Sequence, residues 1–342
     1  MKVVVVPNIP FSFMVGGQEV QIQKTIEHLR LLGCDVEYLD FESRTQREWA
    51  DVYHFFGPNN LHLAQAAADR KPMFISPVIF WNSSLKAAYL QGSAFIPKTY
   101  AYDLRKTLLL ASGIFPNSDS ELYQLARICR MDPRKIEKIP NGVDETFQGG
   151  DPNRFYSKLS NFLKPGEKFV LSVHRIEDRK NTFNLVEAAD RLKVKLILIG
   201  ALGEGKQQAY SSQVMDRIST ASTVRYLGKV DHQTLLDAYA AAHVHALVSH
   251  WETTGLSSLE AGLNGCNLVV TECPPVREYF GDLGFMCNAD VESIATSLKA
   301  ALNDSRNGKG QAQKIKDRYS WRVIAEQTLR AYNRYFSDKR PS

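Results

Sequence analysis

Short apolar runs rich in β-branched residues recur along this chain, and segments with helical periodicity separate them. The first run covers residues 2–6, a helix is expected over residues 18–32, and the next run covers residues 35–40. A continuous apolar run is typical of a strand buried on both faces, as in a parallel sheet. Parallel strands need a crossover connection, which the intervening helix supplies. The start of the chain therefore predicts a βαβ unit.

The same alternation continues through two stretches of the chain. Further strands are expected at residues 51–56, 73–76 and 114–117 in the first stretch, and at residues 169–173, 195–200, 224–227, 245–248 and 267–271 in the second. This rhythm predicts an α/β fold with two Rossmann-like domains, each built on a doubly wound parallel sheet. The ligand site of such a pair is expected in a cleft between the carboxyl ends of their strands.

Glycine, proline and polar residues dominate residues 148–168, and we predict the domain boundary there. The predicted domains are residues 1–155 and residues 165–320, which suits a chain of 342 residues. A last helix is expected over about residues 321–342, with an apolar stripe that begins at Trp321.

The composition is that of a soluble globular protein, with 44% hydrophobic and 23% charged residues. The net charge of +5 permits an acidic substrate or an anionic surface as a partner, but it does not indicate nucleic acid. The five cysteines are odd in number and lack CxxC spacing, which favours reduced thiols and gives no zinc pattern. The first apolar run is too short for a signal peptide or a transmembrane helix. We therefore expect the protein in the cytoplasm.

Residues 251–265, WETTGLSSLEAGLNG, form the clearest candidate ligand site. They follow an apolar run and open a helix, for which Thr253 and Thr254 are candidate N-caps. Gly255 permits a close approach of the backbone to a ligand. The first N–H groups of a helix have no internal partner and the helix dipole is positive there, so a diphosphate fits this end.

Two glutamates flank this helix start. Glu252 lies on the loop before the helix and can accept hydrogen bonds from sugar hydroxyls. Glu260 lies in the second turn and can accept from a neighbouring diol such as a ribose. The stretch therefore predicts a nucleotide-sugar site. The alternative is an ordinary surface helix with acidic residues near its start.

Two cations follow the predicted strand at residues 169–173. Arg175 can neutralise a diphosphate through forked hydrogen bonds, and Lys180 can do so as a point charge. The alternative is a solvated basic loop, because Arg179 is also present there.

Glycines mark two further loops. Gly16 and Gly17 precede the first helix, where their N–H groups form a candidate anion seat and a tight turn is the alternative. Gly200 ends the apolar run at residues 195–200, and a nucleotide can lie against its backbone.

Taken in order along the chain, these motifs resemble those of retaining glycosyltransferases with the GT-B fold, glycosyltransferase family 4 (glycosyl transferases group 1). The matching elements are the Gly16-Gly17 loop, PNGVD at residues 140–144, Arg175-x4-Lys180, LILIG at residues 196–200, YLGKV at residues 226–230, Glu252-x7-Glu260 and the closing tryptophan-bearing helix. The resemblance covers nearly the whole chain. Each motif alone is weak, so their number and order carry the resemblance.

The resemblance implies metal-independent transfer of a sugar, with retained anomeric configuration, from a nucleotide-sugar donor to an acceptor hydroxyl in surface polysaccharide or glycolipid synthesis. It implies no cofactor. Arg175 and Lys180 would bind the donor diphosphate and stabilise the leaving nucleotide, Glu252 would hold the donor sugar, and Glu260 would hold the ribose hydroxyls. The other implied donor contacts are Gly16, Gly17, Gly200, Val230, Thr254, Gly255, Leu256 and Ser257. The last helix would cross back to the amino-terminal domain.

The chain departs from the family pattern in two loops. Many members carry a histidine after the fourth strand, where this chain has Ser76. Ser76 and Asn82 are candidates for the sugar contact instead, and we take His54 as a packing histidine. His174 stands where glycine is usual, which is expected to alter the loop that follows.

The acceptor side is indicated by residues 86–106, which hold four basic residues, one acidic residue and interleaved aromatic side chains. Such a segment can rest on an anionic membrane and meet a lipid-linked acceptor, and ordinary helix packing is the alternative. The expected partners are a nucleotide-sugar and a glycan or lipid-linked acceptor, with no nucleic acid. The expected location is the cytoplasm, with peripheral contact at the inner face of the membrane.

Three other functions compete with a transferase. One is a GT-B relative that hydrolyses or epimerises a nucleotide-sugar, and another is a non-catalytic nucleotide-sugar-binding protein. The joint presence of Arg175, Lys180 and Glu252 argues against a dead site. A dinucleotide oxidoreductase is disfavoured because no GxGxxG motif follows any predicted strand.

Overall fold

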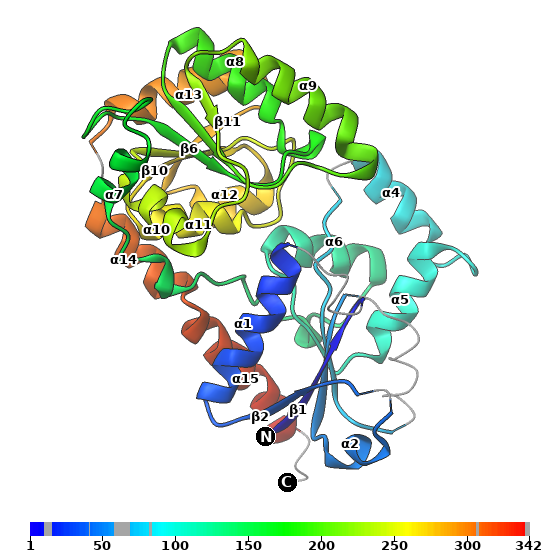
Figure 1. Ribbon diagram of the computed structural model, residues 1–342. Helices are drawn as coiled ribbons and strands as arrows, with labels where there is room; N and C mark the ends of the chain where they lie inside the picture. Colours follow the sequence, from blue (N-terminus) through cyan, green and yellow to red (C-terminus); the bar gives the residue numbers. More distant parts are fainter. Residues whose placement is uncertain (10–15, 41, 58–68, 82–83, 306–307, 339–342) are drawn as a thin grey trace. The chain divides into compact units, whose positions relative to one another are not determined.

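The computed structural model describes residues 1–9, 16–40, 42–57, 69–81, 84–305 and 308–338. The chain divides into two compact units, shown in Figure 1. The first unit consists of Met1–Gly142 and Trp321–Ser342, and the second unit is Val143–Ser320.

The first unit contains a five-stranded sheet with the strand order β2-β1-β3-β4-β5, in which every neighbouring pair is parallel. The strands are β1 (Lys2–Pro7), β2 (Asp35–Tyr38), β3 (Val52–Phe56), β4 (Met73–Ser76) and β5 (Gly113–Ile114). The apolar run of β1 is fully buried, since the strand lies between β2 and β3 with helices on both faces. This is the buried parallel strand that the sequence predicts.

Helices cover both faces of this sheet. One face packs against α1 (Gly17–Leu31) and α15 (Trp321–Asp338), which lie side by side in Figure 1. The other face packs against α4 (Ser84–Ser93), α5 (Tyr100–Leu110) and α6 (Asp119–Cys129). The unit also contains α2 (Arg44–Trp49) and the short 3-10 helix η2 (Pro133–Lys135). The α15 helix therefore completes the core of a unit whose other elements lie at the start of the chain.

His54 joins three elements of the first unit. Its Nε2 atom lies 2.9 Å from Ser76 Oγ on β4, and its Nδ1 atom lies 2.6 Å from the hydroxyl of Tyr332 on α15. Burial lowers the pKa of His54 to about 3, so the ring is neutral at physiological pH. His54 is thus a hydrogen-bonded packing histidine, as predicted.

We expect His54→Leu to reduce the free energy of unfolding by about 2–4 kcal/mol, because it leaves two buried hydroxyls without their imidazole partner. Urea denaturation at pH 7.5 measures this loss. The matched control is His28→Leu on α1, whose ring is half-buried and bonds only its own helix through Lys24 O. Equal stability of the two variants would contradict the role given to His54.

The second unit contains a six-stranded parallel sheet with the order β11-β10-β9-β6-β7-β8. Its strands are β6 (Val170–Val173), β7 (Leu196–Ile199), β8 (Val224–Tyr226), β9 (Val244–Leu247), β10 (Asn267–Thr271) and β11 (Gly284–Cys287). Alternate residues of a strand face opposite sides of the sheet, so Val170 packs in one core and Leu171 in the other.

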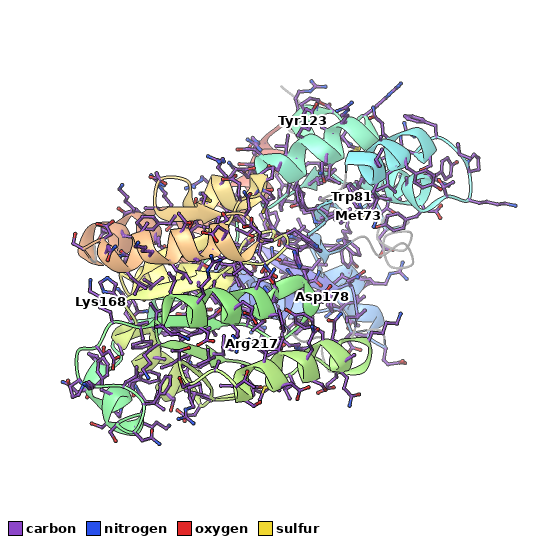
Figure 2. All side chains as sticks on the ribbon, turned by 90° about the horizontal axis from the view of Figure 1, so that it is seen from above. Met73, Trp81, Tyr123, Lys168, Asp178 and Arg217 are labelled. Carbon is purple, nitrogen blue, oxygen red and sulfur yellow. The ribbon has the colours of Figure 1, made fainter. Side chains whose placement is uncertain are left out.

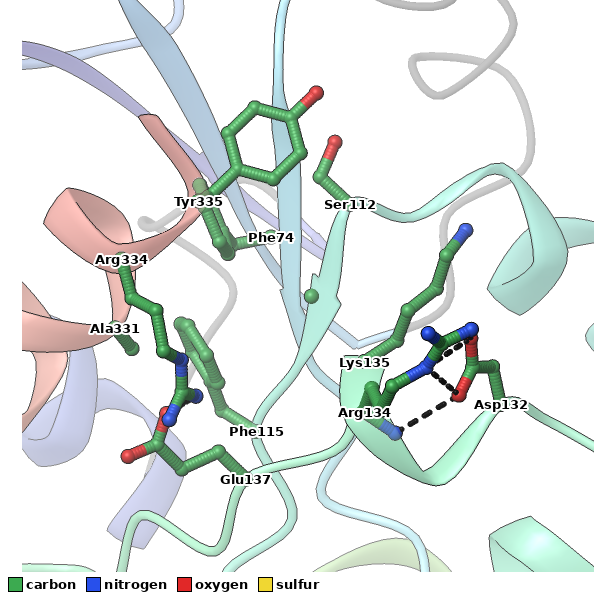
Figure 3. Close-up of a pocket in the computed structure, with 11 residues that line it drawn as sticks. Phe74, Ser112, Phe115, Asp132, Arg134, Lys135, Glu137, Ala331, Arg334 and Tyr335 are labelled. Carbon is green, nitrogen blue, oxygen red and sulfur yellow. Dashed lines mark hydrogen bonds and ion pairs between the residues drawn. The ribbon is translucent and has the colours of Figure 1, made fainter. Parts of the chain in front are cut away.

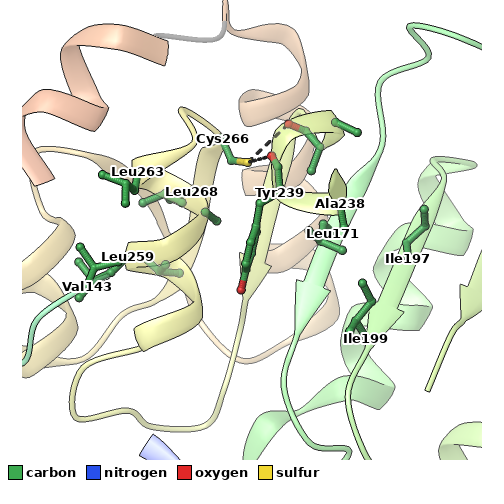
Figure 4. Close-up of a cluster of buried hydrophobic side chains, with 14 of the residues drawn as sticks. Val143, Leu171, Ile197, Ile199, Ala238, Tyr239, Leu259, Leu263, Cys266 and Leu268 are labelled. Carbon is green, nitrogen blue, oxygen red and sulfur yellow. Dashed lines mark hydrogen bonds between the residues drawn. The ribbon is translucent and has the colours of Figure 1, made fainter. Parts of the chain in front are cut away.

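Two cores follow from this alternation. The first lies under α8 (Thr182–Leu192) and α13 (Val291–Asn303). The second, part of which is drawn in Figure 4, lies under α7 (Pro152–Lys158), α10 (His232–Ala241), α11 (Leu256–Leu263), α12 (Pro274–Phe280) and α14 (Gly308–Tyr319). The α9 helix (Gln208–Ser219) packs on α8, where Arg217 binds Glu187 and Asp190 (Figure 2). Short 3-10 helices are η3 (Glu145–Phe147), η4 (Asp178–Lys180) and η5 (Gly205–Gln207).

The change from one unit to the other differs from the prediction. The sequence placed it within residues 148–168, with residues 1–155 in the first domain, but Val143 and Phe155 are buried in the core of the second unit. The polar, glycine-rich composition marks turns and a helix cap rather than a linker, since the Asp151 side chain caps α7. Arg154 of α7 also binds the buried carboxylate of Asp237 on α10. The predicted fold class, with two Rossmann-like parallel-sheet domains, is confirmed.

Candidate active site

The strand order of the second unit shows where a ligand site is expected. The chain runs from β6 outward to β8, then returns to place β9 on the other side of β6. The order therefore reverses between β6 and β9, and doubly wound sheets bind ligands at the carboxyl ends of the strands on either side of such a point. The loops that follow β6 and β9 contain the predicted site residues Lys180 and Glu252.

Glu252 is the centre of a charged cluster formed by these two loops. Its Oε1 atom accepts hydrogen bonds from Arg179 Nη1 (2.9 Å), Ser249 Oγ (2.9 Å) and Lys180 Nζ. Only 6% of the Glu252 residue is exposed. Burial raises the pKa of its carboxyl, but the charges of Lys180 and Arg179 outweigh that effect and hold the pKa below its usual value. Lys180 and Glu252 are far apart in sequence. The structure brings them together as an ion pair at the carboxyl ends of β6 and β9.

Backbone contacts fix the turn that carries Lys180. The next residue, Asn181, has a left-handed backbone with φ 55° and is buried. Its side-chain amide donates to Val248 O at 3.0 Å and to Ala289 O at 2.7 Å. The Arg179 carbonyl accepts from the N–H of His250 at 2.8 Å. These bonds join the loop after β6 to the end of β9.

Arg175 lies outside this cluster. Its Nε atom is 3.6 Å from Glu177 Oε1, and its carbonyl accepts from His174 Nδ1 at 2.9 Å. The sequence assigned Arg175 and Lys180 to a donor diphosphate. Of these two, Lys180 contacts Glu252, and Arg179, which was not assigned to the site, contacts it as well. Whether a donor diphosphate draws Arg175 to itself stays a prediction.

Gly200 lies where two loops meet. It has φ 145°, and a Cβ atom at this position would lie 2.0 Å from the His174 carbonyl oxygen. The Gly200 N–H donates to Gly228 O at 2.9 Å, and its carbonyl accepts from the Tyr226 hydroxyl at 2.8 Å. The glycine is thus required by close packing of the loops after β6 and β7.

The N-terminus of α11 has a different cap from the one predicted. The N-cap residue is Gly255, with φ 84° and no side-chain cap, so the assignment of Thr253 and Thr254 as caps is wrong. The left-handed glycine turns the chain into the helix directly after these threonines. The first helical N–H groups bonded within the helix are those of Ser258 and Leu259, which donate to Gly255 O at 2.9 and 3.3 Å.

This leaves the N–H groups of Leu256 and Ser257 at the helix start, where the dipole is positive. They follow Glu252 by only a few residues, so the stretch predicted to bind the donor is close in sequence to the charged cluster. Thr254 is buried at 3% exposure, which makes its hydroxyl a part of the fold as well as a predicted donor contact.

Glu260 is held by Tyr239. The Tyr239 hydroxyl donates to Glu260 Oε2 at 2.6 Å from a ring that lies in the buried cluster of Figure 4. Burial raises the pKa of Glu260 to about 7, the bond from Tyr239 opposes this, and the negative charge of Asp144 adds to it. Asp144 belongs to the PNGVD motif, so two of the sequence motifs meet at this carboxyl.

This pKa predicts a stability difference that depends on pH. A carboxyl whose pKa is raised on folding stabilises the fold fully below its unfolded pKa of about 4.5, and that contribution is lost as the pH rises through about 7. We expect Glu260→Gln to be more stable than the wild type at pH 8, by up to about 3 kcal/mol, and to have little advantage at pH 5. Urea unfolding at both pH values tests this, with the exposed Glu292→Gln as control. A difference in the free energy of unfolding between Glu260→Gln and the wild type that is the same at pH 5 and pH 8 would contradict this prediction.

The remaining predicted donor residues are spread over both units. Val230 is half-buried against the core of the second unit. Gly16 is the N-cap of α1, with φ 123°, and Gly17 begins that helix in the first unit. Ser76 is buried and bonded to His54, so it is engaged within the fold. Asn82 lies outside the described residues.

A pocket in the first unit is drawn in Figure 3. It lies beside Gly113, at the start of the edge strand β5. Four of its charged side chains form two pairs, since Arg134 binds Asp132 and Arg334 binds Glu137, and Lys135 donates to the Ala111 carbonyl at 3.2 Å. Within the described ranges, no group of three or more His, Cys, Asp or Glu side chains is arranged to hold a metal ion.

Solved structures share this architecture. Sucrose-phosphate synthase from Thermosynechococcus elongatus superposes with a TM-score of 0.78 at 16% identity, covering 99% of this chain and 100% of that one. Anabaena Alr3699/HepE in complex with UDP gives a TM-score of 0.76 at 17% identity, covering 97% and 100%. These likenesses show that the chain has the two-domain GT-B fold. Residues 157–319 match the family described as glycosyl transferases group 1.

Two curated relatives have names that describe the transfer of a sugar. D-inositol 3-phosphate glycosyltransferase of Mycobacterium marinum is 27% identical over 264 residues, which are 74% of this chain and 56% of that protein. O-antigen chain mannosyltransferase B of Escherichia coli is 24% identical over 302 residues, 84% of this chain and 75% of that protein. The chain thus spans little more than half the length of the first of these relatives.

Proposed function

We propose that this protein transfers a sugar from a nucleotide-sugar donor to an acceptor hydroxyl, with retained anomeric configuration and without a metal ion. One observation carries the proposal: Lys180 binds the buried carboxylate of Glu252 where the strand order of the second unit reverses, and α11 begins a few residues after Glu252. Hydrolysis or epimerisation of the same donor, and binding without catalysis, are the competing functions.

The chemistry follows from where charge develops. When the bond between the anomeric carbon and the diphosphate oxygen breaks, its electron pair passes to the diphosphate. The N–H groups of Leu256 and Ser257 and the ammonium of Lys180 are placed to stabilise that charge, and Arg175 is a further cation of the same loop. These groups take the role that a divalent cation has in other sites.

Carboxylates select the rest of the donor. Glu252 accepts from hydroxyls of the transferred sugar, and Glu260 accepts from the ribose, one turn into α11. Solved complexes of the Anabaena protein contain UDP, and UDP-glucose in another crystal, which supports a uridine nucleotide as the first donor to test. Val230 and Gly200 are assigned to the nucleotide, and Gly16 and Gly17 to its phosphates.

The acceptor is proposed to be a glycan or a lipid-linked saccharide, in surface polysaccharide or glycolipid synthesis. The name of one relative, O-antigen chain mannosyltransferase B, supports an acceptor of this kind. No helix within the described part of the chain is both long and apolar enough to cross a bilayer. We propose a cytoplasmic location with peripheral contact at the inner face of the membrane.

A basic and apolar surface supports that contact. Leu85 and Tyr89 on α4 are 85% and 70% exposed, and Tyr100 at the start of α5 is 58% exposed. The Arg105 guanidinium lies 4.6 Å from the centre of the Phe95 ring, which keeps a cation beside the apolar side chains. Aromatic and aliphatic groups flanked by cations suit the boundary between anionic head groups and acyl chains.

Flotation with liposomes tests the membrane contact. We expect binding to vesicles with an anionic lipid, weak binding to phosphatidylcholine alone, and reduced binding of Leu85→Ser/Tyr89→Ser. Wild-type binding that is no stronger with anionic vesicles than with phosphatidylcholine vesicles, or equal binding of the wild type and the variant, would remove the membrane contact without affecting the proposed transferase.

Nucleotide release tests the transferase itself. A thermal-shift screen with UDP-, GDP-, ADP- and TDP-sugars identifies the donor, because a ligand that binds the folded state raises its apparent stability. Release of the nucleotide is then followed with and without a saccharide acceptor. Release that requires the acceptor supports a transferase, release without it supports a hydrolase, and binding without release supports a binding protein.

A further inference from the structure

The carboxylate of Glu252 is held through one oxygen only. Arg179, Lys180 and Ser249 all donate to Oε1. Oε2 accepts no hydrogen bond from the described residues. It is not one of the fully buried oxygen atoms that are left without a hydrogen-bond partner among those residues. The second oxygen of this buried residue therefore reaches accessible space, with its acceptor capacity unused by the described part of the chain.

Arg179 is itself fixed in place. Its Nη1 atom donates to Trp251 O at 3.2 Å as well as to Glu252, and its guanidinium lies 5.0 Å from the centre of the Trp251 ring. Its backbone carbonyl accepts from the N–H of His250. Such a planar guanidinium, stacked and hydrogen-bonded at once, sets a direction for the groups that it contacts.

We propose that Arg179 is a positioning residue for Glu252, holding Oε1 so that Oε2 is the atom that accepts a hydroxyl of the donor sugar. This inference rests on the proposed function. Lys180 and Ser249 also contact Oε1, but Lys180 is assigned to the diphosphate, and a bound donor competes for its ammonium. Arg179 is the cation that remains with Glu252 when Lys180 turns to the donor.

The rival role for Arg179 is direct contact with the diphosphate. The two roles differ in a double-mutant cycle. If Arg179 acts through Glu252, its substitution has little effect on kcat/KM once the carboxylate has been removed. If Arg179 binds the phosphate, its substitution has the same effect on kcat/KM in both backgrounds.

The experiment compares the wild type, Arg179→Met, Glu252→Gln and the double variant, with UDP-glucose as the probe and UDP release as the readout. Met keeps the length of the side chain and removes the charged fork. We expect Arg179→Met to lower kcat/KM about ten- to a hundredfold in the wild-type background, as is typical for loss of a charged hydrogen bond. In the Glu252→Gln background we expect less than about a twofold change.

A pH profile adds a readout that a merely structural role would not move. Arg179 and Lys180 hold the pKa of the Glu252 carboxyl below its usual value. The other groups near it are Ser249 on its own loop, His174, and Cys273, whose thiol contacts the Glu252 backbone carbonyl. Arg179→Met should therefore shift the acidic limb of kcat/KM to higher pH, and this limb should be missing in Glu252→Gln. His174 is neutral at these pH values because burial lowers its pKa to about 4.

Arg191→Met is the matched control, because Arg191 pairs with Glu292 on the surface of the same unit. Equal losses from Arg179→Met in both backgrounds would overturn the inference and assign Arg179 to the diphosphate. An unshifted acidic limb would overturn it as well. A wild type that neither binds nor turns over any of the four nucleotide-sugars refutes the proposed function instead, so the two failures are distinct.

Discussion

We expect Lys180→Ala to lower kcat by about two to three orders of magnitude, the loss typical when one preorganised donor is removed from a developing charge. The ammonium lies in the loop after β6, bound to Glu252, and 14% of the Lys180 side chain is exposed. In a site of low polarity a single charge stabilises a leaving diphosphate more strongly than it does in water. Because the charge grows as the glycosidic bond breaks, the loss should appear in kcat more than in KM.

Steady-state kinetics of UDP release measure this effect. Removal of Lys180 leaves Arg179 to balance Glu252, so the variant should fold, and its melting temperature checks that it does. The matched control is Lys168→Ala, an exposed lysine of the same unit that bonds only the Leu302 carbonyl (Figure 2). Near-normal turnover by Lys180→Ala would remove the central cation from the proposed mechanism.

Gly200→Ala should lower the free energy of unfolding by more than about 4 kcal/mol, which is exceptional for a single substitution. The methyl group would meet the His174 carbonyl at 2.0 Å, where only a shift of backbone relieves the contact. The positive φ of this residue adds strain for any L side chain. Loss of native near-ultraviolet circular dichroism and a reduced urea midpoint measure the effect.

Gly228→Ala separates the two causes. Gly228 has φ 71°, and a Cβ atom there would meet nothing within 4 Å. Its substitution therefore shows the backbone cost alone, typically about 1 kcal/mol. If both variants lose the same stability, close packing of the loops after β6 and β7 is not what requires Gly200.

The fold could be predicted where local pattern and burial agree. The expected strands at residues 73–76 and 267–271 match β4 and β10, since both are continuous buried runs that end in turns. The strand expected at residues 114–117 is instead Gly113–Ile114, because Pro116 has no N–H to continue the ladder. The edge strand β11 was missed, since it is short, half-exposed and poor in β-branched residues.

The site shows the same division. The pairing of Lys180 with Glu252 follows from loops at the carboxyl ends of neighbouring strands, which the βαβ rhythm already indicates. Which arginine of the loop, Arg175 or Arg179, contacts Glu252 does not follow from this rhythm. It depends on the η4 turn and on the left-handed Asn181 that ends it. Tyr239 was missed altogether, since an aromatic residue on an apolar helix face reads as core and its hydroxyl contact with Glu260 is a long-range one.

The placement of α15 has a consequence for biosynthesis. The helix supplies Trp321, Ile324 and Tyr332 to the core of the first unit, yet the ribosome makes it after the whole of Val143–Ser320. The second unit is one continuous segment whose ends meet, since Val143 N–H donates to Tyr319 O at 2.7 Å. The first unit therefore cannot complete its core until the whole of the second unit has been synthesised. A nascent chain arrested near residue 320 would expose the sheet face that α15 covers.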